Sequence, residues 1–501
     1  MSGRRSEPRI YNRCPDRYRC TAVGRAEPGR SGLTNIRRGN IIAEESGGPP
    51  GVDSRAAARV IGGFRVQTIR DRVSRFLTSV GMDAESVDIG RNCDRFIHEM
   101  DRGLKLEGGS LQMIPTYISA EGSARQDEPV IVLDAGGTNL RAAVVHFDRE
   151  GKAVTDQFTR CRMPGTDAPV DSDAFFDRIA ELVEPLLPAS DRIAFCFSYP
   201  AKPRKDKDGA VILVGKEVKV EGITGKLLGV ELIAALERRG ARPHHRVIVL
   251  NDSVATLLSG KAFLHDRVFD GYIGFILGTG TNTCYIEQNE NIRALEADYP
   301  AGSMLVNTES GGYDGFPLPE LVRRFDATTK KPGEYLCEKM ISGRYQGGIV
   351  QTLVQAAAQA GLFSQPFTAA VAGLEDLTSY EIDQFLYYPY GDNRLAVCCG
   401  ASGDADRETL YYLIDAVFER AARLVCVNLA AVMQKTDTGA DPCRPVCITA
   451  DGTAFYHSKL FRDKLNFYVH SFIEGQLHRY CEFVKVDNAT LLGTAIAGLL
   501  N

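Results

Sequence analysis

The chain has no long run of hydrophobic residues. Its longest apolar runs, such as Ile193 to Phe197 and Val247 to Leu250, are far shorter than the roughly 20 residues that a helix needs to cross a bilayer. The chain also has no large excess of charge, because 59 Lys and Arg residues stand against 64 Asp and Glu residues and leave a net charge of −5. No broad field attracts a nucleic-acid backbone, so a polyanion must bind at a local site. We expect a soluble protein with neither a membrane nor a nucleic-acid partner.

The 13 cysteines have no regular spacing. The closest groups are Cys398 with Cys399 and Cys443 with Cys447, and neither has a second pair or a nearby histidine at zinc spacing. An odd number of cysteines in a long chain without an apolar signal segment predicts reduced thiols and a cytoplasmic protein. We therefore expect neither disulfides nor a metal held by cysteine.

Length and composition predict a large globular protein with an atypical beginning. The 501 residues are 44% hydrophobic and 25% charged, which suggests about two to four structural units. The first 60 residues hold 12 Arg, no Lys and 6 acidic residues, with almost no periodic apolar pattern. We interpret residues 1–62 as a disordered Arg-rich extension. The alternatives are a targeting segment, against which the acidic residues count, and a non-native leader from an upstream start.

Beyond Gly63 the hydrophobic pattern indicates helices and short buried strands. Helical spacing predicts one helix across residues 66–80 and another across residues 96–104. Short apolar runs bounded by Gly, Asp or Pro are typical of buried strands. The predicted strands cover residues 130–133, 140–147, 193–197, 247–250, 272–277, 284–287 and 446–449, and two later helices cover residues 410–433 and 491–500. Strands mixed with helices in each half predict two α/β domains.

Two glycine-rich turns give the strongest local signal. The first turn, within Asp134 to Arg141, contains Gly136 and Gly137, and the second runs from Gly278 to Asn282. Glycine lets backbone N–H groups converge on an oxyanion. A helix would follow a Walker loop or a dinucleotide-binding turn, whereas extended alternation continues here, so each turn joins two strands as a hairpin. A single hairpin of this kind is usually a structural turn, but one in each half predicts a phosphate chain held between the two.

Asp252 is a candidate catalytic base. It follows the strand 247–250 and precedes residues with helical spacing, so we expect it at a strand end and a helix N-terminus. There the helix dipole favours the ionised carboxylate and keeps it available to accept a proton at neutral pH. The alternative is that Asn251 and Asp252 only cap the helix, and the local sequence does not separate the two.

The motifs, in this order, resemble those of the hexokinase family of actin-like sugar kinases, from about Arg65 to Leu500. The matched segments are Met113 to Tyr117, Asp134 to Arg141, Phe195 to Pro200, Asn251 to Thr256, Gly278 to Asn282, Asn307 to Glu309 and Asp451 to Thr453. The resemblance implies an α/β fold of two actin-like (ribonuclease H-like) domains with a cleft between them. It assigns residues 63–117 and 253–486 to a large domain and residues 118–252 and 487–501 to a small domain.

The resemblance also implies roles for individual residues. Asp252 would be the general base, and the implied sugar contacts are Ser198, Lys216, Asn251, Asn282, Glu309 and Glu338. The implied nucleotide contacts are Asp134, Gly136, Gly137, Thr138, Asn139, Arg141, Gly278, Thr279, Gly280, Asp451, Gly452 and Thr453. Asp134 would order the water shell of Mg²⁺, whereas Arg141 would contact phosphate or form a structural ion pair. Without the resemblance, Lys216 and Glu338 are typical of solvated charges, Ser198 of a strand-end cap and Asp451-Gly452 of a turn.

The leading hypothesis is therefore a cytoplasmic, glycolytic hexokinase, an ATP:D-hexose 6-phosphotransferase that uses ATP and Mg²⁺. Two residues depart from the family pattern: Gly215 stands where a Thr hydroxyl usually faces the sugar, and Ser310 stands where an aromatic residue commonly follows the Glu. Both weaken the assignment of glucose and leave fructose, mannose or an amino sugar open. The alternative is a catalytically weak, hexokinase-like sugar sensor, against which the retained Asp252 and both hairpins count. The sequence does not predict the oligomeric state or product inhibition.

Overall fold

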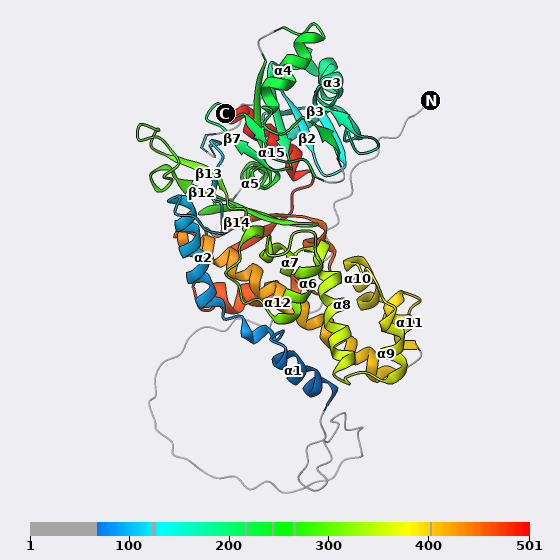
Figure 1. Ribbon diagram of the computed structural model, residues 1–501. Coiled ribbons are helices and arrows are strands. Elements are labelled where there is room, and N and C mark those ends of the chain that lie inside the picture. The colour runs from blue at the N-terminus through cyan, green and yellow to red at the C-terminus, as the bar shows by residue number, and fades with distance from the viewer. Residues whose placement is uncertain are drawn as a thin grey trace, which may run out of the picture. The chain divides into compact units, whose positions relative to one another are not determined.

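The computed structural model describes residues 68–119, 121–122, 127–215, 218–242, 245–263, 267–400 and 403–501. The extension predicted over residues 1–62 and the predicted sugar contact Lys216 lie outside the described residues. The described residues combine helices with two large sheets and two small two-stranded sheets, so the α/β prediction is confirmed (Figure 1). Within the described ranges no helix is both long and apolar enough to span a bilayer.

Five strands form the first sheet, in the order β10-β6-β2-β3-β4. Three of them are parallel, namely β2 (Val130–Ala135), β6 (Arg192–Phe197) and β10 (Arg246–Leu250), and two are antiparallel, namely β3 (Asn139–Phe147) and β4 (Ala153–Arg162). β2 is buried along its whole length because both faces of the sheet are covered. Val130 and Val132 pack with α5 (Asp252–Phe263) and α15 (Ala489–Leu500), whereas Ile131 and Leu133 pack with α3 (Ser172–Val183) and α4 (Leu228–Arg238).

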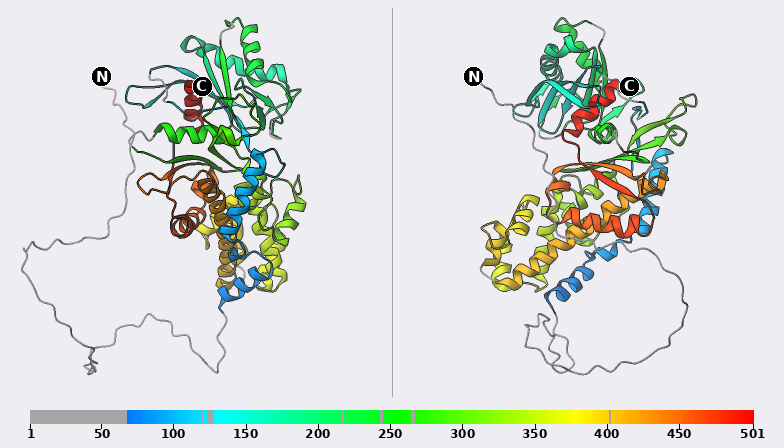
Figure 2. Two further views of the ribbon diagram at one scale, coloured as in Figure 1. Left: turned by 90° about the vertical axis from the view of Figure 1, so that its left-hand side faces the viewer. Right: turned by 180° about the vertical axis from the view of Figure 1, so that it is seen from behind.

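Six strands form the second sheet, in the order β1-β13-β12-β11-β14-β15. Their bounds are β1 (Ile114–Pro115), β11 (Gly271–Leu277), β12 (Thr281–Gln288), β13 (Ser303–Asn307), β14 (Val446–Asp451) and β15 (Cys481–Val484). Cys284 and Leu305 of this sheet share one apolar cluster with α5, α15 and the first sheet. In both views of Figure 2, α15 (red) lies against the first sheet. α5, which begins at Asp252, therefore packs between the two sheets.

A group of helices shares one apolar cluster with the other face of the second sheet, some packing on the sheet and others on neighbouring helices. They are α1 (Ile69–Ser79), α2 (Ile89–Leu104), α6 (Glu320–Thr328), α7 (Leu336–Ile341), α8 (Gly343–Gln359), α9 (Gln365–Ala372), α10 (Ser379–Tyr387), α11 (Arg394–Gly400), α12 (Asp404–Lys435), α13 (Thr453–His457) and α14 (Phe461–Tyr468). The short elements are β5 (Val170–Asp171), β7 (Ala201–Pro203), β8 (Gly209–Val211), β9 (Val220–Glu221), η1 (Ala84–Ser86), η2 (Glu184–Ala189), η3 (Asn289–Asn291), η4 (Ser310–Gly312) and η5 (Val469–Glu474). α12 is buried on all sides over residues 424–433, where all residues but Asn428 are apolar.

The predicted strands and hairpins are confirmed, with differences at the element ends. Both glycine-rich turns join antiparallel strands, β2 to β3 and β11 to β12. The first helix begins at Ile69 rather than at residue 66, because Thr68 and Asp71 form a capping box. The second helix begins at Ile89 rather than at residue 96, because the Asp88 side chain accepts the N–H of Arg91.

Candidate active site

A cavity of about 410 Å³ brings the predicted sugar contacts together. Its wall includes Ser198 after β6, Asn251 and Asp252 at the junction of β10 and α5, Asn282 on β12, Glu309 after β13 and Glu338 on α7. These residues come from both sheets and are up to 140 positions apart in the sequence. The cavity joins them because the ends of β6, β10, β12 and β13 meet there.

Asp252 is the first residue of α5 and is half-buried. Its Oδ1 accepts the N–H of Ser253 at 2.7 Å, and Asn251 Oδ1 accepts the same N–H at 3.0 Å. Burial raises the pKa of Asp252 to about 7. The hydrogen bond from the Ser253 N–H lowers this pKa, whereas the charge of Glu309 adds to the rise. Desolvation therefore outweighs the helix N-terminus that we expected to favour the ionised carboxylate. A carboxylate with a pKa near 7 is well matched to accept a proton at neutral pH.

Glu309 is held by two amides in a strained backbone conformation. Its Oε1 accepts Asn307 Nδ2 at 2.7 Å and Asn282 Nδ2 at 3.1 Å. Its φ of 55° and ψ of 45° are left-handed, which is unfavourable for a residue with a side chain. Burial raises the pKa of this carboxyl, while the two amides act in the opposite direction. Alternating carboxylate and amide groups can both accept from and donate to neighbouring hydroxyls of a sugar.

Asn307 and Tyr335 also line this cavity, although the sequence analysis gave neither a role. Asn307 lies in the Asn-Thr-Glu motif, so its position two residues before Glu309 was a usable signal. Tyr335 precedes α7 with a φ of 55°, and the sequence carries no local sign of that conformation.

The two departures from the family pattern, Gly215 and Ser310, lie behind residues that line the cavity. Ser310 is fully buried, and its hydroxyl lies 3.1 Å from Thr283 Oγ1, which also accepts Asn428 Nδ2. A Cβ on Gly215 would lie 3.1 Å from Cε1 of Tyr199, so the Tyr199 ring occupies the space beside Gly215. The Tyr199 hydroxyl donates to the carbonyl of Gly137 at 2.5 Å.

The first hairpin begins beside a buried ion pair. Asp134 is 1% exposed, forms an ion pair with Arg141 and accepts the Thr490 hydroxyl at 2.9 Å. Burial raises the pKa of Asp134, whereas Arg141 and Thr490 act in the opposite direction. Of the two expected roles of Arg141, the ion pair is present in the structure. Asn139 Oδ1 accepts from Arg160 of β4, with Nη2 at 3.0 Å.

A second cavity, of about 370 Å³, brings several predicted nucleotide contacts together. Arg141, Asp451, Gly452 and Thr453 line it. Lys485 and the N-terminus of α15 at Asn488 to Thr490 also line it, and the sequence analysis missed these residues. An Asn directly before an apolar helical run is a helix-start signal that could have found them. Gly280, predicted as a nucleotide contact, instead lines the first cavity, where a Cβ on it would lie 2.6 Å from Glu338 Oε2.

The carboxylates of the site fit a hydrated Mg²⁺. The charge of Asp451 acts on Asp134, and the charges of Asp134 and Asp451 act on Asp252, so negative charge gathers at this place. Mg²⁺ keeps several waters and is usually bound by one or two carboxylates together with substrate phosphates. In the described part of the chain no group of three or more His, Cys, Asp or Glu could hold a metal ion by itself. A hydrated Mg²⁺ would therefore need the phosphates of a substrate beside these carboxylates.

Comparisons with known proteins match this chain to hexokinases. Two family models, both described as hexokinase, match residues 73–262 and residues 272–500. Chloroplastic hexokinase-2 of Nicotiana tabacum is 28% identical over 434 residues, which are 81% of this chain and 86% of the relative. Hexokinase-1 of Schizosaccharomyces pombe is 27% identical over 395 residues, which are 75% of this chain and 80% of the relative.

Solved structures show the same fold. The Schistosoma mansoni hexokinase complexed with glucose matches with a TM-score of 0.67 at 22% identity and covers 86% of this chain and 98% of its own. A second hexokinase crystal structure matches with a TM-score of 0.69 at 21% identity over the same shares. The predicted fold class of two actin-like domains is confirmed by this likeness.

Proposed function

Since this chain belongs to the hexokinase family, we propose that it transfers the γ-phosphoryl group of ATP to the 6-hydroxyl of a hexose, with glucose as the first candidate. The observation that carries the proposal is the cavity in which Asp252, with a pKa of about 7, lies with Asn282, Glu309 and Glu338. Such a site offers one proton acceptor and several groups that orient hydroxyls.

Each group has a separate task in this proposal. Asp252 accepts the proton of the attacking hydroxyl, while Ser198, Lys216, Asn251, Asn282, Glu309 and Glu338 hold the other hydroxyls. The two hairpins and the loop from Asp451 to Thr453 bind the nucleotide, and Asp134 holds the water shell of Mg²⁺. Bound Mg²⁺ would neutralise charge on the phosphates. Residues 63–117 with 253–486 and residues 118–252 with 487–501 would close as two domains and exclude water.

The cell compartment and pathway belong to the same proposal. We propose a cytoplasmic enzyme of glycolysis, although a tobacco relative is named chloroplastic. Cell fractionation with an antibody against the chain would decide between these compartments.

Asp252→Asn tests the chemical core of the proposal. Asn keeps the size and the capping ability of Asp but cannot accept the proton, so turnover should fall by at least about 10²-fold. Hexose binding, measured by calorimetry, and melting temperature should change far less. Wild-type turnover should also rise with pH through about 7, because the base must be ionised.

Asp171→Asn is the matched control. Asp171 caps α3 by accepting the N–H of Ala174 at 2.8 Å, away from the cavity. It should leave turnover unchanged. Turnover of Asp252→Asn within a few-fold of wild type would remove the base assignment, and a wild-type protein that binds hexose without turnover would favour the sensor.

A further inference from the structure

α7 is a short helix that carries one wall of the sugar cavity. It has six residues, too few to be stable by itself, so its position depends on tertiary contacts. Glu338 of α7 lines the cavity and its Oε2 accepts the N–H of Thr281 at 3.1 Å. Tyr335, directly before the helix, lines the same cavity. The question is what fixes this helix in place.

The residue after Glu338 on α7, Lys339, forms a buried ion pair with Asp326 of α6. Lys339 is 2% exposed and Asp326, at the end of α6, is 6% exposed. Lys339 Nζ donates to Asp326 Oδ1 and to the carbonyl of Lys331, the latter at 2.6 Å. Neither contact lies in the wall of the sugar cavity.

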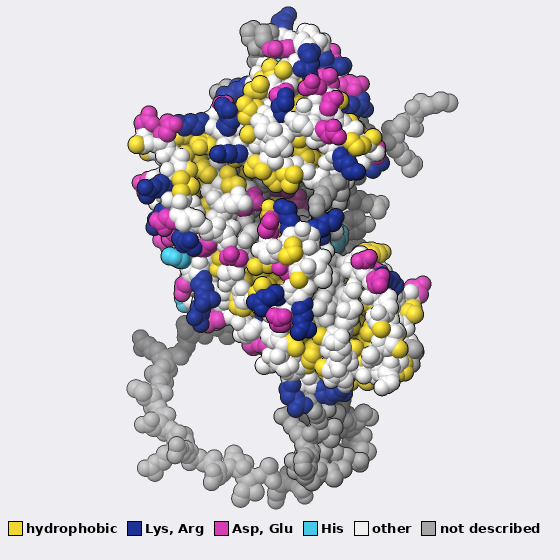
Figure 3. Space-filling view, in the orientation of Figure 1, with side chains coloured by type: hydrophobic (Ala, Val, Ile, Leu, Met, Phe, Trp, Pro, Cys, Tyr) yellow, Lys and Arg dark blue, Asp and Glu magenta, His cyan; other side chains and the backbone are white. Residues whose placement is uncertain are grey.

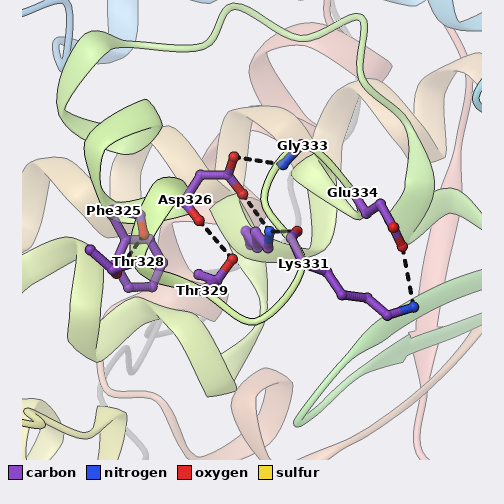
Figure 4. A network of polar contacts seen from close by, with 8 residues as sticks. Phe325, Asp326, Thr328, Thr329, Lys331, Gly333 and Glu334 are labelled. Atoms are coloured by element: carbon purple, nitrogen blue, oxygen red, sulfur yellow. Dashed lines mark hydrogen bonds and ion pairs between the residues drawn. The ribbon is translucent and has the colours of Figure 1, made fainter.

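Asp326 also holds the loop between α6 and α7. Its Oδ2 accepts the N–H of Gly333 at 2.8 Å, and its backbone carbonyl accepts the N–H and the hydroxyl of Thr329 at 2.9 and 2.7 Å (Figure 4). Lys339 has two acceptors for its ammonium group and both carboxylate oxygens of Asp326 accept, so the buried pair has a favoured geometry. The pair therefore fixes residues 329–335 and α7 together.

The chain directly after α7 holds the second glycine-rich hairpin. The N–H of Gly343 donates to the carbonyl of Gly278 at 2.8 Å, and the N–H of Arg344 donates to the carbonyl of Thr279 at 3.4 Å. One segment, residues 335–344, thus contacts the sugar cavity through Glu338 and the hairpin through its last two residues. A shift of α7 would move both.

We propose that the Lys339–Asp326 pair is a positioning device that couples hexose binding to the second phosphate hairpin through α7. Both residues act through Glu338 and the hairpin and do not touch substrate. The inference rests on the proposed function, because the hairpin is taken to hold phosphate. Hexose binding should then tighten nucleotide binding, and nucleotide binding should tighten hexose binding by the same factor.

The test compares three variants, Lys339→Met, Asp326→Asn and the double variant Lys339→Met with Asp326→Leu. The readouts are hexose KM, kcat, melting temperature and the affinity for a non-hydrolysable ATP analogue with and without hexose. Each single variant should raise hexose KM roughly tenfold, as expected for a lost charge-assisted hydrogen bond, and bring the coupling factor close to one. The kcat should change less than KM.

The double variant separates positioning from stability. Replacing a buried ion pair by apolar residues often restores stability, but it cannot restore the bonds to Lys331 and Gly333. We expect a recovered melting temperature with a hexose KM that remains raised. If the double variant recovers both, or if the single variants leave KM and coupling unchanged, the proposal is overturned.

Lys435→Met is the matched control. The Lys435 side chain is 10% exposed, against 2% for Lys339, and pairs with Asp101 at 2.5 Å and Glu287 at 3.6 Å, outside the sugar cavity. It should lower stability without changing KM or coupling, and an equal change of KM in this control would also overturn the proposal. A wild-type protein without kinase activity on glucose, fructose or mannose would instead contradict the proposed function.

Discussion

The two glycine-rich hairpins have similar sequences and different surroundings. A Cβ on Gly137 of the first hairpin would meet no atom within 4 Å, and one on Gly136 would meet only Asn139 O at 3.8 Å. A Cβ on Gly278 of the second hairpin would lie 3.5 Å from Gly452, and one on Gly280 would lie 2.6 Å from Glu338 Oε2. The first hairpin leaves space for a ligand, whereas the second uses its glycines to let protein atoms approach.

The supports of the two hairpins differ in the same way. The first hairpin accepts the hydroxyl of Tyr199 at the Gly137 carbonyl and the N–H of Met163 at the Thr138 carbonyl, and neither of these contacts comes from a residue that holds a predicted sugar contact. The second hairpin receives N–H groups from Gly343 and Arg344 and gives one to Glu338. The same motif thus has different surroundings in the two hairpins, and substitutions should separate them. Changes in the second hairpin should affect folding and hexose binding in addition to nucleotide binding, whereas changes in the first should affect nucleotide binding alone.

Gly452→Ala should have the largest effect, because it acts on the packed hairpin. Gly452 has a φ of 119°, and a Cβ on it would lie 2.3 Å from the carbonyl oxygen of Leu277. A backbone clash in a conformation that side chains rarely adopt should lower the free energy of unfolding by about 2–4 kcal/mol. Thermal and urea unfolding would measure the loss. An unchanged melting temperature would show that the packing of the second hairpin is adaptable.

Gly280→Ala should affect hexose binding more than nucleotide binding. The new Cβ displaces the far end of the Glu338 side chain and weakens its bond to the Thr281 N–H. Loss of a hydrogen bond to a carboxylate, about 2 kcal/mol, predicts a hexose KM raised roughly 30-fold. Steady-state kinetics with each substrate varied would measure this. If the nucleotide KM changed more than the hexose KM, Gly280 would be a nucleotide contact, as the sequence predicted.

Gly137→Ala should affect nucleotide binding more than hexose binding. The added methyl enters open space and its backbone φ is not in the left-handed region, so stability should be kept. If phosphate approaches this backbone, a weakened N–H contact to a charged oxygen should raise the nucleotide KM roughly tenfold. Gly373→Ala, equally open and at the end of α9, is the control. Equal kinetics for both variants would exclude phosphate from the first hairpin at this position.

The sequence predicted the hairpins because their signal is local. Buried strands such as β2 and β10 are continuous apolar runs that end in Gly, Asp or Asn. The sequence analysis missed the ten-residue strand β4 because it is mostly exposed and has no apolar alternation. This strand forms through its pairing with β3. Sequence patterns find elements that bury their own apolar face. They do not find an edge strand of this kind.

Site features that depend on tertiary structure were out of reach for the same reason. The raised pKa of Asp252 comes from burial between two sheets, which the residues around it do not encode. The packing of Gly280 against Glu338 joins positions 58 residues apart. The sequence alone predicts a phosphate contact equally for Gly280 and Gly137, and only their surroundings in the structure distinguish the two.

Tyr199→Phe should have the smallest effect and gives the finest comparison. The variant keeps the ring, which packs 5.2 Å from the Phe197 ring, and removes the hydroxyl that donates to the Gly137 carbonyl at 2.5 Å. Loss of one neutral hydrogen bond, about 1 kcal/mol, predicts a nucleotide KM raised roughly fivefold. Tyr199 also lines the sugar cavity, so an unchanged hexose KM is the discriminating result. Tyr285→Phe is the control. It removes the hydroxyl of Tyr285 on β12, which donates to Glu287 at 2.6 Å, and should lower stability without changing either KM. If Tyr199→Phe changes the hexose KM and leaves the nucleotide KM unchanged, the hydroxyl serves the sugar cavity, and the first hairpin does not depend on it.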